Sequence, residues 1–169
     1  MGKRTIESIE GKRVRLRLLE EGDLPLTLFW RNQPHIRKWF LDSQIITPQQ
    51  HSAWFRLYQE RDDDFTFVIE ETRTYNRPVG QIAIYDIDWT RGRGQFGRLM
   101  IGDPEVVGCG LAHEAAALLV DACCQRLGLR EVYLDVYNDN LPACAIYSRC
   151  GFSVIEQRGT ILRMSRFFC

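Results

Sequence analysis

The sequence has few of the residues that build metal centres or disulfide frameworks. Its 6 cysteines form no Cys-x-x-Cys pair, and its 3 histidines are not spaced like zinc ligands. A zinc site and a disulfide scaffold are therefore not expected. Reduced, packed thiols of this kind are typical of a cytosolic protein, so we predict a cytoplasmic location and no metal cofactor.

An excess of charge of one sign is also missing, and so is a long apolar run. Lys plus Arg and Asp plus Glu both count 22, so the formal net charge is zero, which argues against a nucleic-acid partner. Residues 1–5 carry charge but no apolar stretch follows them, and the apolar segment 115–120 is far too short to cross a bilayer. We expect no membrane partner and a small neutral or mixed-charge substrate.

The chain does contain enough apolar material for one core. It has 169 residues, of which 45% are hydrophobic, and a domain of this size buries about 70% of the surface of its unfolded chain. No repeat, low-complexity tract or linker interrupts it. We therefore predict a single α+β domain over residues 1–169.

Apolar periodicity and turn residues divide the chain into strands and helices. They predict strands over residues 14–18, 65–71, 79–87, 95–101, 131–137, 152–157 and 160–166. They predict helices over residues 24–32, 34–40, from 48 onward, 111–127 and 141–149, with Asp23 and Thr47 as N-caps of the first and third. The three strands between residues 65 and 101 follow one another without a helix, which is typical of an antiparallel meander.

The strand over residues 95–101 leads into a glycine-containing turn and a long apolar helix. Gly108 and Gly110, separated by Cys109, let the backbone turn tightly and leave the first N–H groups of the helix bare. The helix dipole adds about half a positive charge at this end, so main chain alone can hold a phosphate or pyrophosphate. An ordinary helix start, with glycines for close packing, is the alternative interpretation.

A second sequence pattern downstream supports a functional interpretation of this turn. The two patterns comprise Glu105, Gly108 and Gly110, followed by Asn140, Ala143, Tyr147, Gly151 and Phe152. Together they resemble the signatures of the GNAT superfamily of acyl-CoA-dependent N-acetyltransferases, and the resemblance extends over nearly the whole chain. It implies a mixed, largely antiparallel central sheet flanked by helices, and acetyl-CoA as co-substrate. Glu105 departs from the pattern, because Arg or Gln is usual there and a negative charge weakens the attraction for phosphate.

The resemblance implies a coenzyme site built mainly from main chain. The pantetheine arm would pair with the backbone of Leu99, Met100 and Ile101. The pyrophosphate would be held by the turn and helix start, which are Gly108, Cys109, Gly110, Leu111 and Ala112. The later pattern would complete the site with Asn140 and Ala143, the amide of Asn140 reaching the pantetheine.

Acetyl transfer from a thioester to an amine requires a neutral amine, a clamp on the carbonyl and a proton for the departing thiolate. By resemblance, Tyr147 is the general acid that supplies this proton, and a core aromatic is the alternative interpretation. Cys109 and Cys150 raise the alternative of a covalent acetyl-cysteine. Small size explains a cysteine in a phosphate turn better.

The general base is left open by the sequence. Many relatives have a glutamate on the strand before the glycine turn, whereas residues 95–101 contain no acid. A lysine-type amine with a pKa of about 10.4 needs strong help to lose its proton, while an α-amino-like group at about 7.7–8.0 needs little. The missing carboxylate therefore favours a weakly basic amine, with His51, Asp86 and Asp88 as candidate bases.

The N-terminal third supplies the candidate acceptor site. A pattern of GNAT enzymes that acetylate amino groups of nucleotide-linked sugars, as in pseudaminic-acid pathways, resembles the segments Trp30-Arg31-Asn32, His35-Ile36-Arg37 and, later, His51 to Trp54. Aromatic faces suit stacking on a sugar or base, and an arginine suits a diphosphate. The alternative is that Trp30 and Trp54 anchor the core and Arg31 is solvated.

The leading hypothesis is direct acetyl transfer from acetyl-CoA to a small-molecule amine, with the amino group of a nucleotide-linked sugar as acceptor. Ribosomal-protein N-terminal acetyltransferases share the early strand, the glycine turn and the later Asn/Tyr pattern, so a protein N-terminus is an alternative acceptor. A catalytically silent acyl-CoA-binding module is a third hypothesis. A homodimer is left open as the assembly.

Overall fold

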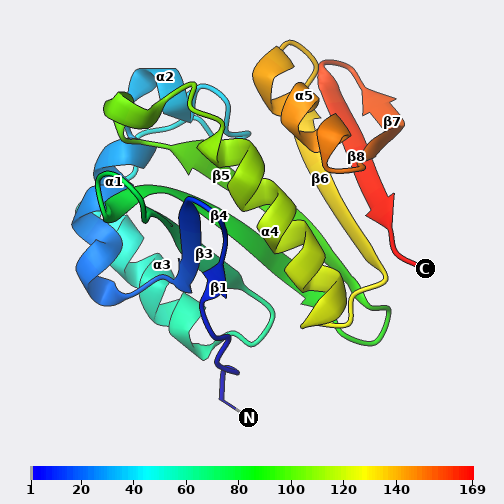
Figure 1. Ribbon diagram of the computed structural model, residues 1–169, viewed down its shortest axis with the longest axis horizontal. Helices are drawn as coiled ribbons and strands as arrows, with labels where there is room; N and C mark the ends of the chain where they lie inside the picture. Colours follow the sequence, from blue (N-terminus) through cyan, green and yellow to red (C-terminus); the bar gives the residue numbers. More distant parts are fainter. Residues whose placement is uncertain (1) are drawn as a thin grey trace.

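An eight-stranded sheet is the framework of the computed structural model, which describes residues 2–169 (Figure 1). Its strands are β1 (Ile9–Glu10), β2 (Val14–Leu18), β3 (Phe65–Glu71), β4 (Arg77–Asp88), β5 (Arg93–Ile101), β6 (Glu131–Tyr137), β7 (Ser153–Arg158) and β8 (Ile161–Phe167). The helices are α1 (Leu24–Arg31), α2 (Pro34–Arg37), α3 (Pro48–Glu60), α4 (Leu111–Gln125) and α5 (Leu141–Arg149). Short 3-10 turns η1 (Glu21–Asp23) and η2 (Pro104–Val106) lie before α1 and after β5.

The strands lie in the order β1-β2-β3-β4-β5-β6-β8-β7, and each neighbouring pair is antiparallel except β5 and β6. This confirms the predicted α+β class and the meander of β3, β4 and β5. Because β5 and β6 are parallel, the chain needs a crossover between them. Helix α4 makes this crossover and lies along β4 and β5 (Figure 1).

Both faces of the sheet are covered, each by different helices. On one face, Phe67 and Ile69 of β3 share the main core with Leu119 of α4. On the other face, Val68 packs in a smaller cluster with Phe55 of α3. Successive side chains of a strand point to opposite faces, so a strand that is buried on both needs an almost continuous apolar run, which residues 65–69 supply.

Local capping agrees with the sequence at one helix and differs at another. Thr47 accepts a hydrogen bond from the Gln50 N–H at 3.1 Å, which confirms the predicted N-cap of α3. The carboxylate of Asp23 does not cap α1, because Arg17 binds it at 2.8 Å. Helix α2 ends at Arg37 and not at residue 40 as predicted. Strand β1 was not predicted, since two residues are too few to show a period.

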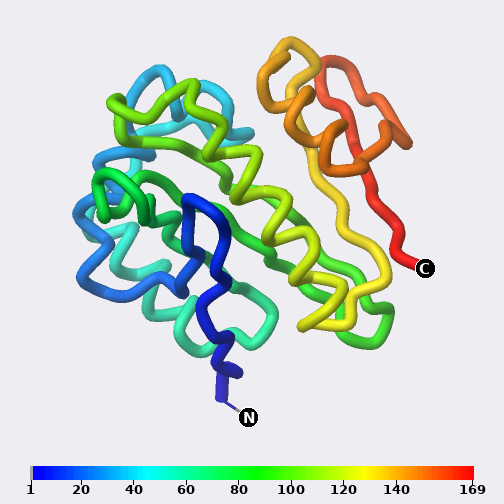
Figure 2. The backbone as a smooth tube through the Cα atoms, in the orientation of Figure 1, coloured from blue at the N-terminus to red at the C-terminus, as the bar shows by residue number. Residues whose placement is uncertain are grey.

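The sheet opens between β5 and β6. The two strands pair only where Arg93–Gln95 faces Glu131–Tyr133, although β5 continues to Ile101 and β6 to Tyr137. The backbone trace shows the two strands moving apart beyond this short ladder (Figure 2). The second half of β5 therefore has a free edge toward β6.

A bulge in β5 accompanies the opening. Gln81 of β4 pairs with Met100 while Ala83 pairs with Gly97, so β5 contains one extra residue over this stretch. Arg98 lies there with a φ of +53°, a left-handed conformation that is uncommon for a residue other than glycine. A bulge bends a strand and increases its twist, which turns the end of β5 away from β6.

None of the helices described for residues 2–169 has both the length and the apolar character that a membrane crossing requires. Over the same residues, no three His, Cys, Asp or Glu side chains gather as metal ligands would. The cysteines are all free thiols.

Candidate active site

The free edge of β5 presents main-chain groups to the opening. The Gly102 N–H donates to the Val79 carbonyl at 2.8 Å, on the β4 side. Peptide groups alternate in direction along a strand. Those of Leu99 and Ile101 therefore face away from β4, toward the opening, while that of Met100 faces β4. Two of the three residues predicted to pair with pantetheine thus direct donors and acceptors into the opening.

The glycine turn lies at the start of α4 with its amides exposed. Gly108 and Gly110 have φ values of +79° and +82°, a conformation that costs glycine nothing sterically. Gly110 is the N-cap of α4 and no side chain caps it. The first amides of the helix, beginning at Leu111 and Ala112, have no intrahelical acceptor. With Cys109 exposed beside them, they form the surface that an anion requires.

Arg13 is a residue of this site that the sequence did not indicate. Its Nη1 donates to the Cys109 carbonyl at 2.8 Å, and its Nε donates to Glu114 at 3.0 Å. Burial acts against the charge of Glu114, but hydrogen bonds from the amides of Arg13 and Val14 and from the Arg13 side chain hold the pKa of this carboxyl below its usual value. The guanidinium is thereby fixed beside the turn, from a position 96 residues away in the chain.

Glu105, the departure from the family pattern, is paired with an arginine. Arg77 donates from Nη2 to Glu105 at 2.9 Å and from Nε to Asp103 at 2.8 Å. Both carboxylates share one guanidinium at the start of β4. The negative charge of Glu105 is therefore partly offset, because one cation serves two carboxylates.

Tyr147 lies on α5 with its ring against β5. Ring centroids are 6.0 Å apart for Phe96 and Tyr147, at a near-perpendicular angle, and 5.9 Å apart for Tyr147 and Phe152. Burial raises the pKa of the Tyr147 phenol, which keeps it protonated near neutral pH. A protonated phenol can donate a proton, which is the role predicted for this residue.

Asn140 begins the helix that carries Tyr147. Its Oδ1 accepts a hydrogen bond from the Ala143 N–H at 3.4 Å, as an N-cap does. This bond leaves the Nδ2 donor of Asn140 unused, and that is the group which a pantetheine carbonyl would need.

Two of the predicted acceptor residues have packing roles in the fold. Trp30 is only 3% exposed and packs with Met100 and Ile36, and any side chain at Gly102 would overlap its ring. Asn32 donates to the Ile46 carbonyl at 2.8 Å and accepts from the Ile46 N–H at 2.9 Å, so both of its amide groups hold the loop before α3.

His51 and Trp54 lie together on α3. Their rings stack with centroids 5.4 Å apart. The Nε2 of His51 lies 3.2 Å from the Thr27 hydroxyl, and burial lowers the pKa of this imidazole. A neutral imidazole can accept a proton, so His51 keeps the chemistry of a base.

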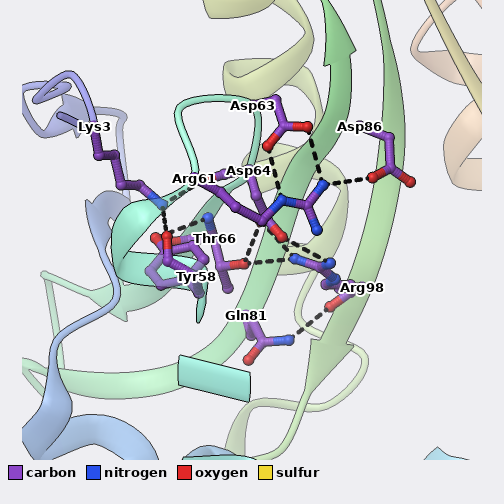
Figure 3. Close-up of polar contacts among 9 residues, drawn as sticks. All are labelled: Lys3, Tyr58, Arg61, Asp63, Asp64, Thr66, Gln81, Asp86 and Arg98. Atoms are coloured by element: carbon purple, nitrogen blue, oxygen red, sulfur yellow. Dashed lines mark hydrogen bonds and ion pairs between the residues drawn. The ribbon is translucent and has the colours of Figure 1, made fainter. Parts of the chain in front are cut away.

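A buried ion pair under the bulge of β5 was missed by the sequence reading (Figure 3). Asp64 is fully buried, and Arg98 binds it with two hydrogen bonds of 2.7 and 3.0 Å. Arg98 also donates to the Thr66 hydroxyl at 3.0 Å and lies 4.0 Å from the centre of the Tyr85 ring. A charged residue in a strand that leads to the coenzyme turn was the available signal, but its partner is 34 residues away.

The other candidate bases lie at the surface in ion pairs. Asp86 accepts from Arg61 at 2.9 Å (Figure 3), and Asp88 lies 3.7 Å from Arg91. Lys3, also drawn there, donates to the carbonyls of Tyr58 and Asp64, and burial lowers the pKa of its amine to about 8.

Known proteins resemble this chain in sequence and in fold. The family model for the acetyltransferase (GNAT) domain matches residues 13–153. Spermidine N(1)-acetyltransferase of Escherichia coli (strain K12) is 28% identical over 141 residues, which is 83% of this chain and 73% of that protein. The spermidine N-acetyltransferase from Vibrio cholerae, solved with CoA and spermine, has a TM-score of 0.84 at 22% identity and covers 93% of this chain and 96% of that one. The apo structure of FdhC, a nucleotide-linked sugar GNAT, has a TM-score of 0.79 at 18% identity, covering 98% and 90%.

Proposed function

The chain belongs to the GNAT family and is an acetyl-CoA-dependent N-acetyltransferase, and we propose that its acceptor is the amino group of a nucleotide-linked sugar. We propose Tyr147 as the general acid and the β5 edge with the glycine turn as the coenzyme site. A cytoplasmic location belongs to the same proposal, because free thiols fit a reducing compartment.

One observation carries the coenzyme part of the proposal. The peptide groups of Leu99 and Ile101 face the opening between β5 and β6, and Tyr147 packs on Phe96 of the same strand. An extended amide-rich arm bound along this edge would place its thioester end near the phenol. The bare amides from Gly110 onward would hold the pyrophosphate.

The reaction then follows from these groups. The lone pair of the neutral amine attacks the thioester carbon while a β5 amide polarises the carbonyl oxygen. The carbon–sulfur bond breaks, the sulfur keeps the electron pair, and Tyr147 donates its proton to it. The attacking nitrogen loses one proton, which passes to His51 or through water and restores the phenol. Every proton is accounted for without an oxidant or a metal.

The acceptor part of the proposal rests on charge. The buried carboxylate of Asp64 is paired with Arg98, and those of Asp86 and Asp88 are paired at the surface. These acids are therefore not free to bind a polycation. A weakly basic amine also fits a site whose candidate base is a neutral histidine. The likeness to a nucleotide-linked sugar GNAT in fold supports the same choice.

Spermidine is the second candidate acceptor, favoured by the spermidine N(1)-acetyltransferase relative. Release of CoA thiol should be measured with a UDP-linked 4-amino sugar, spermidine and an N-terminal peptide as acceptors. We expect the highest kcat/KM for the sugar nucleotide. A higher kcat/KM for spermidine or for the peptide would overturn the proposed acceptor, and tight acetyl-CoA binding without thiol release from any amine would overturn the catalytic proposal.

A further inference from the structure

Arg31 differs from most arginines of this protein because it is buried without a carboxylate partner. Its side chain and backbone together are only 8% exposed. Nη2 donates to the Asp42 carbonyl, and the guanidinium carbon lies 4.1 Å from the centre of the Phe40 ring. Nη1 is buried and has no hydrogen-bond partner among residues 2–169. The Arg31 guanidinium is thus held in place by the Asp42 carbonyl and the Phe40 ring, while its Nη1 donor remains unused.

Arg37 binds the same loop as Arg31. Its Nη1 donates to the Ser43 carbonyl at 3.0 Å, while its buried Nε has no partner in the described chain. Asp42 and Ser43 are consecutive, so the two guanidinium groups bind carbonyls of adjacent residues in the same loop. Burial has the largest effect on the pKa of Arg31 and lowers it; the charge of Asp42 opposes this, and the charge of Arg37 makes a smaller contribution that also lowers the pKa.

The charges around this pair do not balance. Residues 31–47 contain three cations, Arg31, Arg37 and Lys38, and a single acid, Asp42, which gives a net charge of +2 in a chain of net charge zero. Asp42 is exposed, and its Oδ1 accepts from the Gln44 N–H at 3.1 Å. Two neighbouring guanidinium groups with spare donors repel each other unless an oxyanion lies between them, and the planar fork of arginine matches a carboxylate or a phosphate.

The pair is also close to the end of β5. Trp30 precedes Arg31 and packs on Met100, while Ile36 precedes Arg37 and joins the same cluster. Both arginines therefore follow residues that are anchored on the strand whose free edge faces the opening. Figure 1 shows α2 and the loop after it beside the end of β5, with α5 on the other side of the opening.

We propose that Arg31 and Arg37 form an oxyanion site that binds the acidic group, a phosphate or a carboxylate, of the amine acceptor. Arg37 lies in the segment that resembles nucleotide-sugar GNAT enzymes but has no role assigned from the sequence, and the pair selects amines that carry an oxyanion over polycations such as spermidine. The inference rests on the proposed transfer to a small amine and narrows its substrate class.

Binding of UDP to the full protein saturated with CoA tests the site, because CoA then occupies the glycine turn and leaves the arginine pair as the anion site. Isothermal titration should be run for the native protein, for Arg37→Gln and Arg37→Lys, and for Arg56→Gln as a control. Arg56 is exposed on α3 and makes no ion pair in the described chain. We expect UDP affinity to fall about tenfold in Arg37→Gln, less in Arg37→Lys, and to stay unchanged in Arg56→Gln.

Two companion titrations distinguish the sources of the oxyanion. 4-Aminobutyrate offers a carboxylate in place of a phosphate, and spermidine offers no anion. Binding of either UDP or 4-aminobutyrate that depends on Arg37 supports the site and identifies the anion. Equal affinity of the native protein and Arg37→Gln for both anions, or a loss of CoA affinity in Arg37→Gln, would overturn it.

The kinetic arm separates this inference from the proposed function. With a UDP-linked 4-amino sugar, Arg37→Gln should raise the acceptor KM about tenfold with little change in kcat or in the acetyl-CoA KM. If UDP binds through Arg37 but the native protein acetylates none of the amines, the proposed acceptor is wrong while the anion site stands. A thermal melt of each variant shows whether it is folded.

Discussion

The proposed coenzyme site (the coenzyme side) and the proposed acceptor site (the acceptor side) of this enzyme are built in different ways. The coenzyme side is mostly main chain, from the free edge of β5 and the turn at Gly108 and Gly110, and the side chain of Asn140 at the start of α5 completes it. The acceptor side would consist of side chains, chiefly Arg31 and Trp54, with the Asp64–Arg98 pair beside Trp54. A main-chain site binds the same coenzyme whatever the side chains are, whereas a side-chain site can change its acceptor by substitution.

The strongest way to break the coenzyme side is a backbone change. Gly110→Val puts a branched residue at a φ of +82° beside bare amides and 3.4 Å from Arg13. We expect CoA affinity to fall by more than about a hundredfold in calorimetry, because the turn must distort. Gly159→Val is the matched control, since Gly159 has a φ of +59° and open space around it, in the β7–β8 hairpin. Equal loss of CoA binding in both variants would mean that the turn acts only through stability.

The next largest effect concerns the phenol between the two sides. Tyr147→Phe keeps the ring packing on Phe96 and Phe152 and removes only the proton donor. We expect kcat to fall about a hundredfold with an unchanged dissociation constant for acetyl-CoA, as is typical for loss of a general acid. Tyr75→Phe, at a partly exposed ring, should leave both constants unchanged. Native activity in Tyr147→Phe would remove this residue from the mechanism.

Loss of the buried carboxylate of Asp64 should lower the stability of the protein more than loss of an exposed carboxylate. Asp64→Asn leaves Arg98 buried without its counter-charge, and we expect the free energy of unfolding to fall by about 3 kcal/mol in urea denaturation. Asp86→Asn breaks an exposed ion pair with Arg61 and should cost less than about 1 kcal/mol. Similar decreases in the free energy of unfolding of the two variants would show that the buried ion pair stabilises the fold no more than the exposed one.

A smaller, pH-dependent effect also belongs to the acceptor side. Burial holds the pKa of His51 below its usual 6.5 in the folded protein. Between the two values the unfolded chain binds more protons than the folded one, so stability should decrease as the pH falls below about 6.5. His51→Gln should reduce this slope when unfolding is measured between pH 7 and pH 5. An unchanged slope would mean that other groups cause the acid sensitivity.

The residues proposed for the coenzyme side are easier to identify in the sequence than those of the acceptor side, for a physical reason. The structural effects of Gly108, Gly110 and Asn140 are confined to backbone within a few residues of each. A short sequence pattern therefore contains all the residues that such a local structure needs. The Arg98–Asp64 pair joins residues 34 apart and the contact of Arg13 with Cys109 joins residues 96 apart. No periodicity in a single sequence encodes such contacts.

The fold shows the same division between local and distant causes. The capping box at Thr47 and the meander of β3, β4 and β5 follow from local signals, and both were predicted. The separation of β5 from β6 was not, because it depends on a bulge at Arg98 that is held by β3 and β4 neighbours. The sequence leaves Trp30 open as a stacking surface or a core anchor, and its burial over Gly102, which makes it a core anchor, depends on a strand end that is distant in sequence.

Amide hydrogen exchange with and without CoA compares the two sides in one experiment. With saturating CoA, we predict exchange at least about tenfold slower in peptides covering residues 97–112, with no change in peptides covering residues 30–47. Addition of UDP to the same sample should then slow exchange in residues 30–47. Unchanged exchange over residues 97–112 in a sample that binds CoA would contradict a coenzyme site made from the β5 edge and the glycine turn.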